Sequence, residues 1–245
     1  MSTGASTGTW RVMTWNILGA HDPDLGDIAS EIVALSPDVI AIQEIRHRQA
    51  RRLARLLGWH HVWARKHSPY TPMVWWRAEG LAVLSPLPLT HRFAATISPG
   101  VSTWTYRHRI ILAATVHRGR EAIRLFCTHL ASDDPDARIE QARRVAAFLR
   151  SEQRLATFDA VVAGDLNTTD DPVPVLRELR AIGLVDHGGD CTSPSIAPSQ
   201  RIDYVLLPER ANELGTHTPE GGERWNGLSD HLPVLVEFTL PTRQS

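Results

Sequence analysis

The chain has 245 residues, of which 42% are hydrophobic and 22% charged, and its formal net charge is −1. These values are ordinary for a globular protein and give no indication of disorder. The near-zero charge excludes the strongly basic surface of proteins that hold nucleic acid mainly by its phosphates, so such binding would require a local patch. The two cysteines, Cys127 and Cys191, cannot build a disulfide framework, which favours a reduced, cytoplasmic setting.

The chain shows no sign of a targeting segment or of division into domains. Residues 1–9 are rich in Ser, Thr and Gly and lack the features of a secretion signal, so we expect a flexible tail. No apolar run approaches the roughly 20 residues that cross a bilayer, and we expect no membrane anchor. We find no linker or internal repeat, so residues 10–245 are predicted to form one domain, and we expect a monomer.

The first half of the chain alternates strands and helices. A predicted strand at residues 10–16 is followed by a helix that Asp27 caps and Pro37 stops. A strand at 38–44 precedes a helix at 46–57, which ends at Gly58. A loop rich in Pro and Gly is expected at 68–72, and further strands follow at 79–85, 110–117 and 122–129.

The second half continues the same pattern. A third helix opens at Asp134-Pro135, with an N-cap followed by proline at the first helical position, and a strand follows at 159–167. A fourth helix repeats this opening at Asp171-Pro172 and closes at Gly183. Loops at 186–198 and 215–227 alternate with strands at 201–207 and 232–240. The pattern predicts an α/β or α+β layered sandwich of mixed sheets with flanking helices.

Polar residues stand at the ends of six predicted strands, either closing the strand or directly preceding it. They are Asn16, Glu44, His129, the pair Asp165 and Asn167, Asp203, and the pair Asp230 and His231. Each of them alone is typical of a turn or a cap. Turn formation alone does not explain why all six strand ends carry such residues. These residue types can also bind metal ions or transfer protons.

The same positions carry six short motifs that resemble, in order, those of the endonuclease/exonuclease/phosphatase superfamily. The motifs are Thr14-Trp15-Asn16, Ile42-Gln43-Glu44, Thr128-His129-Leu130, Gly164-Asp165-Leu166-Asn167, Arg201-Ile202-Asp203-Tyr204 and Ser229-Asp230-His231-Leu232-Pro233. The resemblance covers residues 10–240. It implies a four-layered α/β sandwich, in which two packed mixed β-sheets are flanked by helices and the site lies at one rim.

The resemblance also implies roles for individual residues in the hydrolysis of a phosphate ester. Asp165 would orient or deprotonate the attacking water, and Asn167 would donate to the developing charge. His231 would contact the phosphoryl oxygen with Asp203 paired to it, because a neighbouring carboxylate raises the pKa of a histidine. His129 would contact the phosphate or act as acid to the leaving group.

A divalent cation is expected in this site. Enzymes accelerate the slowest phosphate-ester hydrolyses by up to ~10²¹-fold, whereas one general acid or base contributes only about 10² to 10⁴. Mg²⁺ prefers hard oxygen ligands and needs one or two carboxylates besides the substrate phosphate. We expect Mg²⁺, with Mn²⁺ as an alternative, held by Glu44 together with Asn16 and Asp230. Arg109 matches an arginine that some family members place near the phosphate, and Arg107 is equally near in sequence.

The substrate and some surface features stay open at this point. A phosphodiesterase or nuclease is placed first, ahead of a phosphatase acting on an inositol, lipid-headgroup or small-metabolite phosphate. A catalytically silent binding scaffold is the third alternative. The aromatic residues from Trp59 to Trp76, followed by Trp104 and Tyr106, either line a substrate groove or pack in the core. His60, His61 and His67 are expected at the surface.

Overall fold

The computed structural model describes residues 8–68, 72–153, 158–169 and 174–241, so most of the predicted tail lies outside these ranges. Within them the strands form two sheets of six strands each. The first sheet contains, in spatial order, β11 (Asn212–His217), β12 (Val234–Thr239), β1 (Trp10–Asn16), β2 (Val39–Arg46), β4 (Glu79–Ser85) and β3 (His60–Arg65). The second contains β5 (Leu89–Thr96), β6 (Ile110–Arg118), β7 (Glu121–His129), β8 (Asp159–Asp165), β10 (Asp203–Pro208) and β9 (Leu184–Val185).

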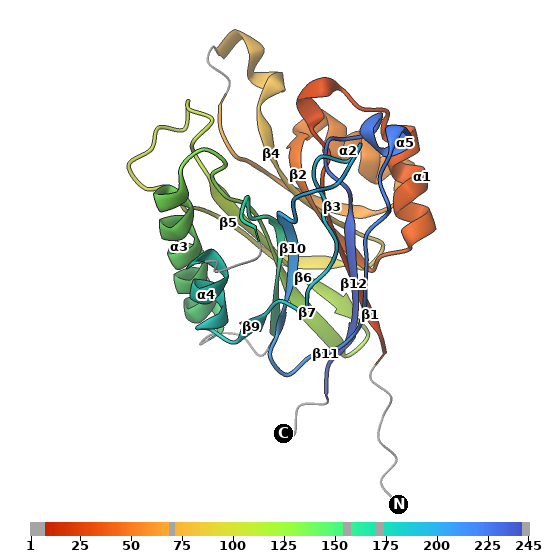
Figure 1. Cartoon of the computed structure of the whole chain (residues 1–245), viewed down its shortest axis with the longest axis vertical. Helices are drawn as coiled ribbons and strands as arrows, with labels where there is room; N and C mark the ends of the chain where they lie inside the picture. The colour runs from red at the N-terminus through yellow and green to blue at the C-terminus, as the bar shows by residue number, and fades with distance from the viewer. Residues whose placement is uncertain (1–7, 69–71, 154–157, 170–173, 242–245) are drawn as a thin grey trace, which may run out of the picture.

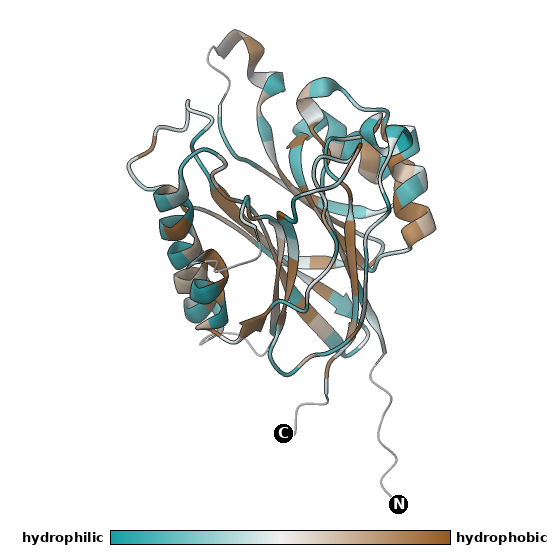
Figure 2. Cartoon of the chain, viewed as in Figure 1, coloured by the Kyte–Doolittle hydropathy of each residue, from teal (hydrophilic) through white to brown (hydrophobic). Residues whose placement is uncertain are grey.

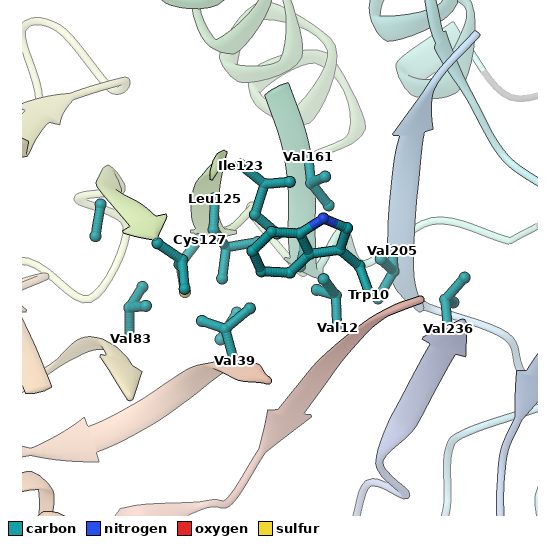
Figure 3. Close-up of a cluster of buried hydrophobic side chains, with 14 of the residues drawn as sticks. Trp10, Val12, Val39, Val83, Ile123, Leu125, Cys127, Val161, Val205 and Val236 are labelled. Carbon is teal, nitrogen blue, oxygen red and sulfur yellow. The ribbon is translucent and has the colours of Figure 1, made fainter. Parts of the chain in front are cut away.

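The two sheets pack face to face and enclose the central core. Strand β1 lies against β8 and β10, β2 against β7, and β4 against β6. Figure 3 shows Val12 and Val39 of the first sheet meeting Leu125 and Val161 of the second around Trp10, and each of these side chains is buried. The central strands are buried on both faces, which explains why they appear in the sequence as continuous apolar runs.

Helices cover the outer face of each sheet (Figure 1). Helices α1 (Leu25–Leu35) and α2 (His47–Leu57) pack on the first sheet, and α3 (Pro135–Gln153) and α4 (Pro174–Arg180) pack on the second. The helices carry many hydrophilic residues on their outer surfaces, whereas hydrophobic residues are concentrated in the strands between them (Figure 2). The order helix, sheet, sheet, helix is the predicted four-layered sandwich, and the fold prediction is confirmed. None of the described helices is long and apolar enough to span a membrane.

The helix ends agree with the sequence patterns except at the first and fourth helices. Helix α4 ends at Arg180 and a turn at 181–183 follows it, so the predicted end at Gly183 was wrong. The N-cap of α1 is Asp24, whose side chain accepts from Gly26 N and Asp27 N, so the prediction of Asp27 as the cap was wrong. Helix α2 ends at Gly58 as predicted. Asp134 accepts from Ala137 N at 3.0 Å at the start of α3. The predicted opening of the fourth helix at residues 171–172 lies outside the described residues.

The strands that the sequence patterns missed lie mainly at the sheet edges. The side chains of β3, β5 and β11 are mostly exposed or partly buried, so these strands lack the continuous apolar run by which the central strands were found. The predicted loop at 215–227 contains the end of β11 and the short helix α5 (Glu223–Asn226). In the predicted 68–72 loop, residues 69–71 lie outside the described ranges, and the 3₁₀ helix η2 (Pro72–Arg77) begins at its end.

Strand direction gathers the six motifs at one rim of the sandwich. Strands β1 and β2 pair in parallel, as do β7 and β8, so the motif residues at their carboxyl ends share an edge. Strand β10 runs antiparallel to β8, and Asp203 at its start pairs with Asp165 at the end of β8. Strand β12 runs antiparallel to β1, which places Asp230 and His231, just before it, at the same rim.

Gly164 in β8 shows how closely the backbone is packed beside this rim. A Cβ atom at Gly164 would overlap the carbonyl oxygen of Thr128 on β7. We expect Gly164→Ala to lower the free energy of unfolding by about 1–3 kcal/mol or more, because a backbone atom must move. Urea denaturation measures this loss. Gly215→Ala on β11, where no atom lies within 4 Å of the added Cβ, is the matched control. Equal stabilities of the two variants would contradict this account of β8.

Candidate active site

A cleft of about 360 Å³ opens at the rim where the motifs converge. Thirteen residues line it: Asn16, Glu44, Lys66, His67, Glu79, Tyr106, Arg109, His129, Ser132, Asp165, Asn167, Asp230 and His231. Eight of the nine predicted site residues are among them. The exception is Asp203, which is hydrogen-bonded to His231 and does not line the cleft itself.

Asp203 and His231 form a buried carboxylate–imidazole pair. His231 Nδ1 lies 2.8 Å from Asp203 Oδ2, which also accepts from the Thr192 hydroxyl at 2.6 Å. Burial alone would lower the pKa of His231, but the charge of Asp203 and this hydrogen bond raise it to about 10. His231 is therefore an imidazolium at neutral pH, and its Nε2 lies 3.9 Å from Asp165 Oδ2.

Asp165 is enclosed by groups from strands β1, β7 and β10 and from the segment that follows β8. Its Oδ2 accepts from Asn16 Nδ2 at 3.1 Å and lies 3.5 Å from His129 Nε2, and its Oδ1 accepts from Asn167 N at 2.9 Å. Burial, followed by the charge of Asp203, raises the pKa of Asp165 to about 7. A carboxylate that gains and loses a proton near neutral pH is suited to general acid–base chemistry.

His129 lies between Asp165 and Glu44, with Nδ1 3.7 Å from Glu44 Oε1. Burial, followed by the charges of Lys66 and Arg109, lowers the pKa of His129 well below its ordinary value. The imidazole is therefore neutral at neutral pH and can donate a single N–H. A neutral imidazole is a hydrogen-bond donor at one ring nitrogen and an acceptor at the other.

Asn16, Glu44 and Asp230 supply oxygen atoms at one side of the cleft. Glu44 has a left-handed backbone with φ of 55° at an irregularity in the β2–β4 pairing, which is uncommon for a residue other than glycine. Its Oε1 accepts from Asn16 Nδ2 at 3.3 Å. Strained backbone of this kind is found at functional sites, where the surrounding structure holds it in place.

The ionised side chains of the cleft leave a negative charge that a bound cation would balance. Four lining carboxylates outnumber three lining cations and leave a formal charge of −1 when all seven are ionised: Glu44, Glu79, Asp165, Asp230, Lys66, Arg109 and His231. Hard oxygen donors and a negative balance fit a divalent cation such as Mg²⁺.

A second group could also be considered for a metal, because Asp165, Asp203 and His231 offer ligand atoms within 4.8 Å of one another. An imidazolium has no free lone pair for a metal ion. The Asp203 oxygen that faces His231 is already engaged by two hydrogen bonds. The Glu44 side of the cleft therefore fits the cation better.

The two candidate arginines have different positions. Arg109 is 3% exposed, lines the cleft and donates from Nη1 to Tyr106 O at 2.7 Å. Arg107 has a half-exposed side chain that donates to Asp133 at 3.1 Å at the surface. The backbone turn at this point places one arginine in the cleft and the other at the surface, a difference that the sequence did not show.

Five lining residues were not among the predicted site residues. Lys66, His67, Glu79, Tyr106 and Ser132 line the cleft without belonging to a motif. The expectation of a surface position for His67 was wrong, since its side chain is only partly exposed within the cleft. Glu79 begins a predicted strand, and Tyr106 is among the aromatic residues that the sequence offered for a groove. Lys66 and His67 follow β3, which was not predicted, so no sequence signal pointed to them.

Some of the aromatic residues pack against the core, and others lie at the cleft or the surface. Trp59 and Trp63 pack against the core below α2. Trp104 and Tyr106 are 46% and 43% exposed, and Tyr106 lines the cleft. The aromatic segment is therefore part core and part rim.

Comparison with solved structures identifies many with the same fold. An endonuclease/exonuclease/phosphatase from Beutenbergia cavernae is 24% identical, with 95% of this chain and 72% of that chain covered and a TM-score of 0.75. A mannosyl-6-phosphatase from Bacteroides thetaiotaomicron is 16% identical, with 94% and 100% covered and a TM-score of 0.75. TDP2 from D. rerio, complexed with single strand DNA product, is 17% identical, with 95% and 99% covered and a TM-score of 0.72.

A comparison with curated protein sequences finds no significant match. The family model described as Endonuclease/Exonuclease/phosphatase family matches residues 13–231. This range contains the predicted site residues from Asn16 to His231 and every strand except β12 and the first residues of β1. The chain therefore belongs to the endonuclease/exonuclease/phosphatase family.

Proposed function

We propose that the protein is a Mg²⁺- or Mn²⁺-dependent hydrolase of phosphate esters that acts first of all as a phosphodiesterase or nuclease. One observation carries the proposal: the buried Asp165 carboxylate and the His231 imidazolium face one cleft, 3.9 Å apart, beside the oxygens of Glu44 and Asn16. A proton acceptor and a cationic donor at this spacing can contact an attacking water and a phosphoryl oxygen of the same substrate.

Each side chain has a role that its protonation state allows. Asp165 accepts the proton of the attacking water, because its pKa of about 7 leaves it ionised above neutral pH. His231 donates from Nε2 to a phosphoryl oxygen, and Asp203 holds its ring through Nδ1. His129, as a neutral imidazole, donates to a second oxygen. Asn167, whose Nδ2 donates to Leu130 O at 3.1 Å, fixes Asp165 through its backbone N–H and adds an amide to the phosphate pocket.

Glu44, Asn16 and Asp230 would hold the divalent cation at the other side of the phosphate. A bound cation of this kind polarises the phosphoryl oxygen and neutralises the charge that develops during hydrolysis.

One structural neighbour supports a diester as substrate. TDP2 is complexed with single strand DNA product, which fits a phosphodiesterase or nuclease as the first candidate. The mannosyl-6-phosphatase is a neighbour of equal similarity, so a phosphatase acting on an inositol, lipid-headgroup or metabolite phosphate is the second candidate.

A silent binding scaffold is the third candidate. Burying the charged groups of Asp165 and His231 lowers the stability of the folded protein. A scaffold without catalytic activity would not need these groups. The intact site supports an enzyme instead.

Three assays distinguish these functions. We expect the purified protein to hydrolyse bis-p-nitrophenyl phosphate and to cut plasmid DNA with Mg²⁺ or Mn²⁺, and to lose both activities with EDTA. Faster hydrolysis of p-nitrophenyl phosphate than of the diester would favour the phosphatase. No turnover of any of the three substrates, with metal bound, would leave only the scaffold.

A further inference from the structure

Lys66 is a buried cation that the proposed reaction does not use. It directly follows β3, is 4% exposed, and its Nζ lies 3.4 Å from Glu79 Oε2. The backbone already joins these two residues, since Lys66 N donates to Glu79 O at 2.9 Å. The end of β3 is therefore held without the ammonium group, and burying that charge is a cost that strand pairing does not explain.

Arg109 has a buried donor that no described residue satisfies. Its Nε has no hydrogen-bond partner among the described residues, although the side chain is 3% exposed and lines the cleft. Unsatisfied buried donors are rare in folded proteins and indicate a missing partner. A guanidinium group accepts no hydrogen bond, so the partner must offer an oxygen or another acceptor.

His67 adds a third nitrogen to the same region. Its Nδ1 also lacks a partner among the described residues, and His67 lines the cleft beside Lys66. Burial, followed by the charges of Lys66 and Arg109, lowers its pKa to about 4, so the ring is neutral. The pKa of Lys66 is likewise lowered by burial and then by Arg109. An anion between Lys66 and Arg109 would reduce the repulsion between their positive charges. We call Lys66 and Arg109, together with the neutral His67 beside them, the cationic pole.

The cationic pole lies apart from the residues that would attack the phosphorus atom. In the first sheet, β3 is two strands from β2, which carries Glu44, and this corresponds to roughly 10 Å at the spacing of neighbouring strands. In the second sheet, Arg109 precedes β6, whereas Asp165 ends β8, also two strands away. Because β6 packs against β4, the pole occupies one end of the cleft and the catalytic residues the other.

We infer that the cationic pole binds a second anionic group of the substrate, at a distance from the phosphate under attack. This inference rests on the proposed function and narrows it to phosphate esters that carry another phosphate nearby, as in an oligonucleotide or a bisphosphorylated nucleotide. Glu79 holds the ammonium group of Lys66 when no such group is bound. An arriving phosphate accepts from Lys66 and from the free Nε of Arg109.

Binding of small nucleotides tests the inference without turnover. The probes are thymidine 3′,5′-bisphosphate and the two thymidine monophosphates, titrated calorimetrically into metal-free protein. We expect the wild type to bind the bisphosphate at least tenfold more tightly than either monophosphate, as a charge-assisted contact provides. Lys66→Met should remove most of this difference. Arg65→Met, which removes the exposed charge of the neighbouring residue, should preserve it.

A double variant is the control for misfolding of the Lys66→Met variant. Lys66→Met leaves Glu79 buried without its partner, whereas Lys66→Met/Glu79→Gln removes both charges, and thermal denaturation compares the two. The inference is overturned if the double variant keeps the preference for the bisphosphate, or if the wild type has none. Failure of the proposed function is a separate result, because it appears as absent hydrolysis of diesters and not as a change in this preference.

Discussion

Replacement of Asp165 by asparagine is expected to lower kcat for phosphate-ester hydrolysis by about 10² to 10⁴-fold, the contribution of a positioned general base. The amide has nearly the shape of the carboxylate and can still accept from Asn167 N, but it cannot take up a proton from water. The measurement is kcat and KM at saturating Mg²⁺ with the ester that the wild type cleaves fastest. A double variant with His231→Gln should lose little more than the more damaging single change, since the two residues act on one phosphate.

Stability measurements separate loss of the base from loss of the fold. Since the folded-state pKa of Asp165 is raised from 3.8 to about 7, its ionised form destabilises the folded protein increasingly as pH rises from 3.8 to 7. In the presence of chelator at pH 8 we therefore expect Asp165→Asn to melt no lower than the wild type.

Asp159 provides the matched control, because it is a buried carboxylate at the other end of β8. It accepts from Arg210 Nε at 2.6 Å, far along the strand from the cleft. Asp159→Asn should lose stability and keep kcat. Full activity in Asp165→Asn, or equal loss of kcat in both variants, would contradict the assignment of the base.

Replacement of Glu44 by glutamine is expected to raise the Mg²⁺ or Mn²⁺ concentration for half-maximal activity by at least the 10–100-fold typical of groups that only support a metal ligand. Glu44 offers a carboxylate beside Asn16 where the cleft has excess negative charge, and the amide removes that charge. Calorimetric titration of Mn²⁺ into the protein should show the same weakening without substrate present.

Glu140→Gln is the control for Glu44→Gln, because it removes a half-exposed carboxylate from the outer surface of α3. We expect its metal dependence to equal that of the wild type. Unchanged Mn²⁺ affinity in Glu44→Gln would place the cation elsewhere, and the Asp165, Asp203 and His231 group would then be the position to test.

The central strands and the residues at their ends could be predicted from the sequence. Strands buried on both faces require continuous apolar runs, and a polar residue that ends such a run stands at a sheet edge. Asn16 and Glu44, like His129 and Asp165, lie at or near the carboxyl ends of neighbouring parallel strands, so their convergence follows from local patterns together with the resemblance. The edge strands β3 and β11 could not be found in this way, because most of their side chains are exposed or only partly buried.

The enclosed polar residues outside the motifs depended on the tertiary structure. Lys66 is the only lysine among the 26 basic residues of the sequence, but its burial follows from no local pattern. It arises because β3 pairs with β4 and brings Lys66 to Glu79. In the same way, a turn of the backbone places Arg107 at the surface and Arg109 in the cleft.

By itself, therefore, the amino-acid sequence determined the layers, the central strands and the motif residues of this protein, since these depend on the spacing of apolar and polar residues along the chain. The tertiary structure alone decided which other charged groups share the cleft and which protonation states they adopt. Burial and the charges of residues distant in sequence set the pKa values of Asp165, His231 and His67, and neither quantity can be obtained from local spacing.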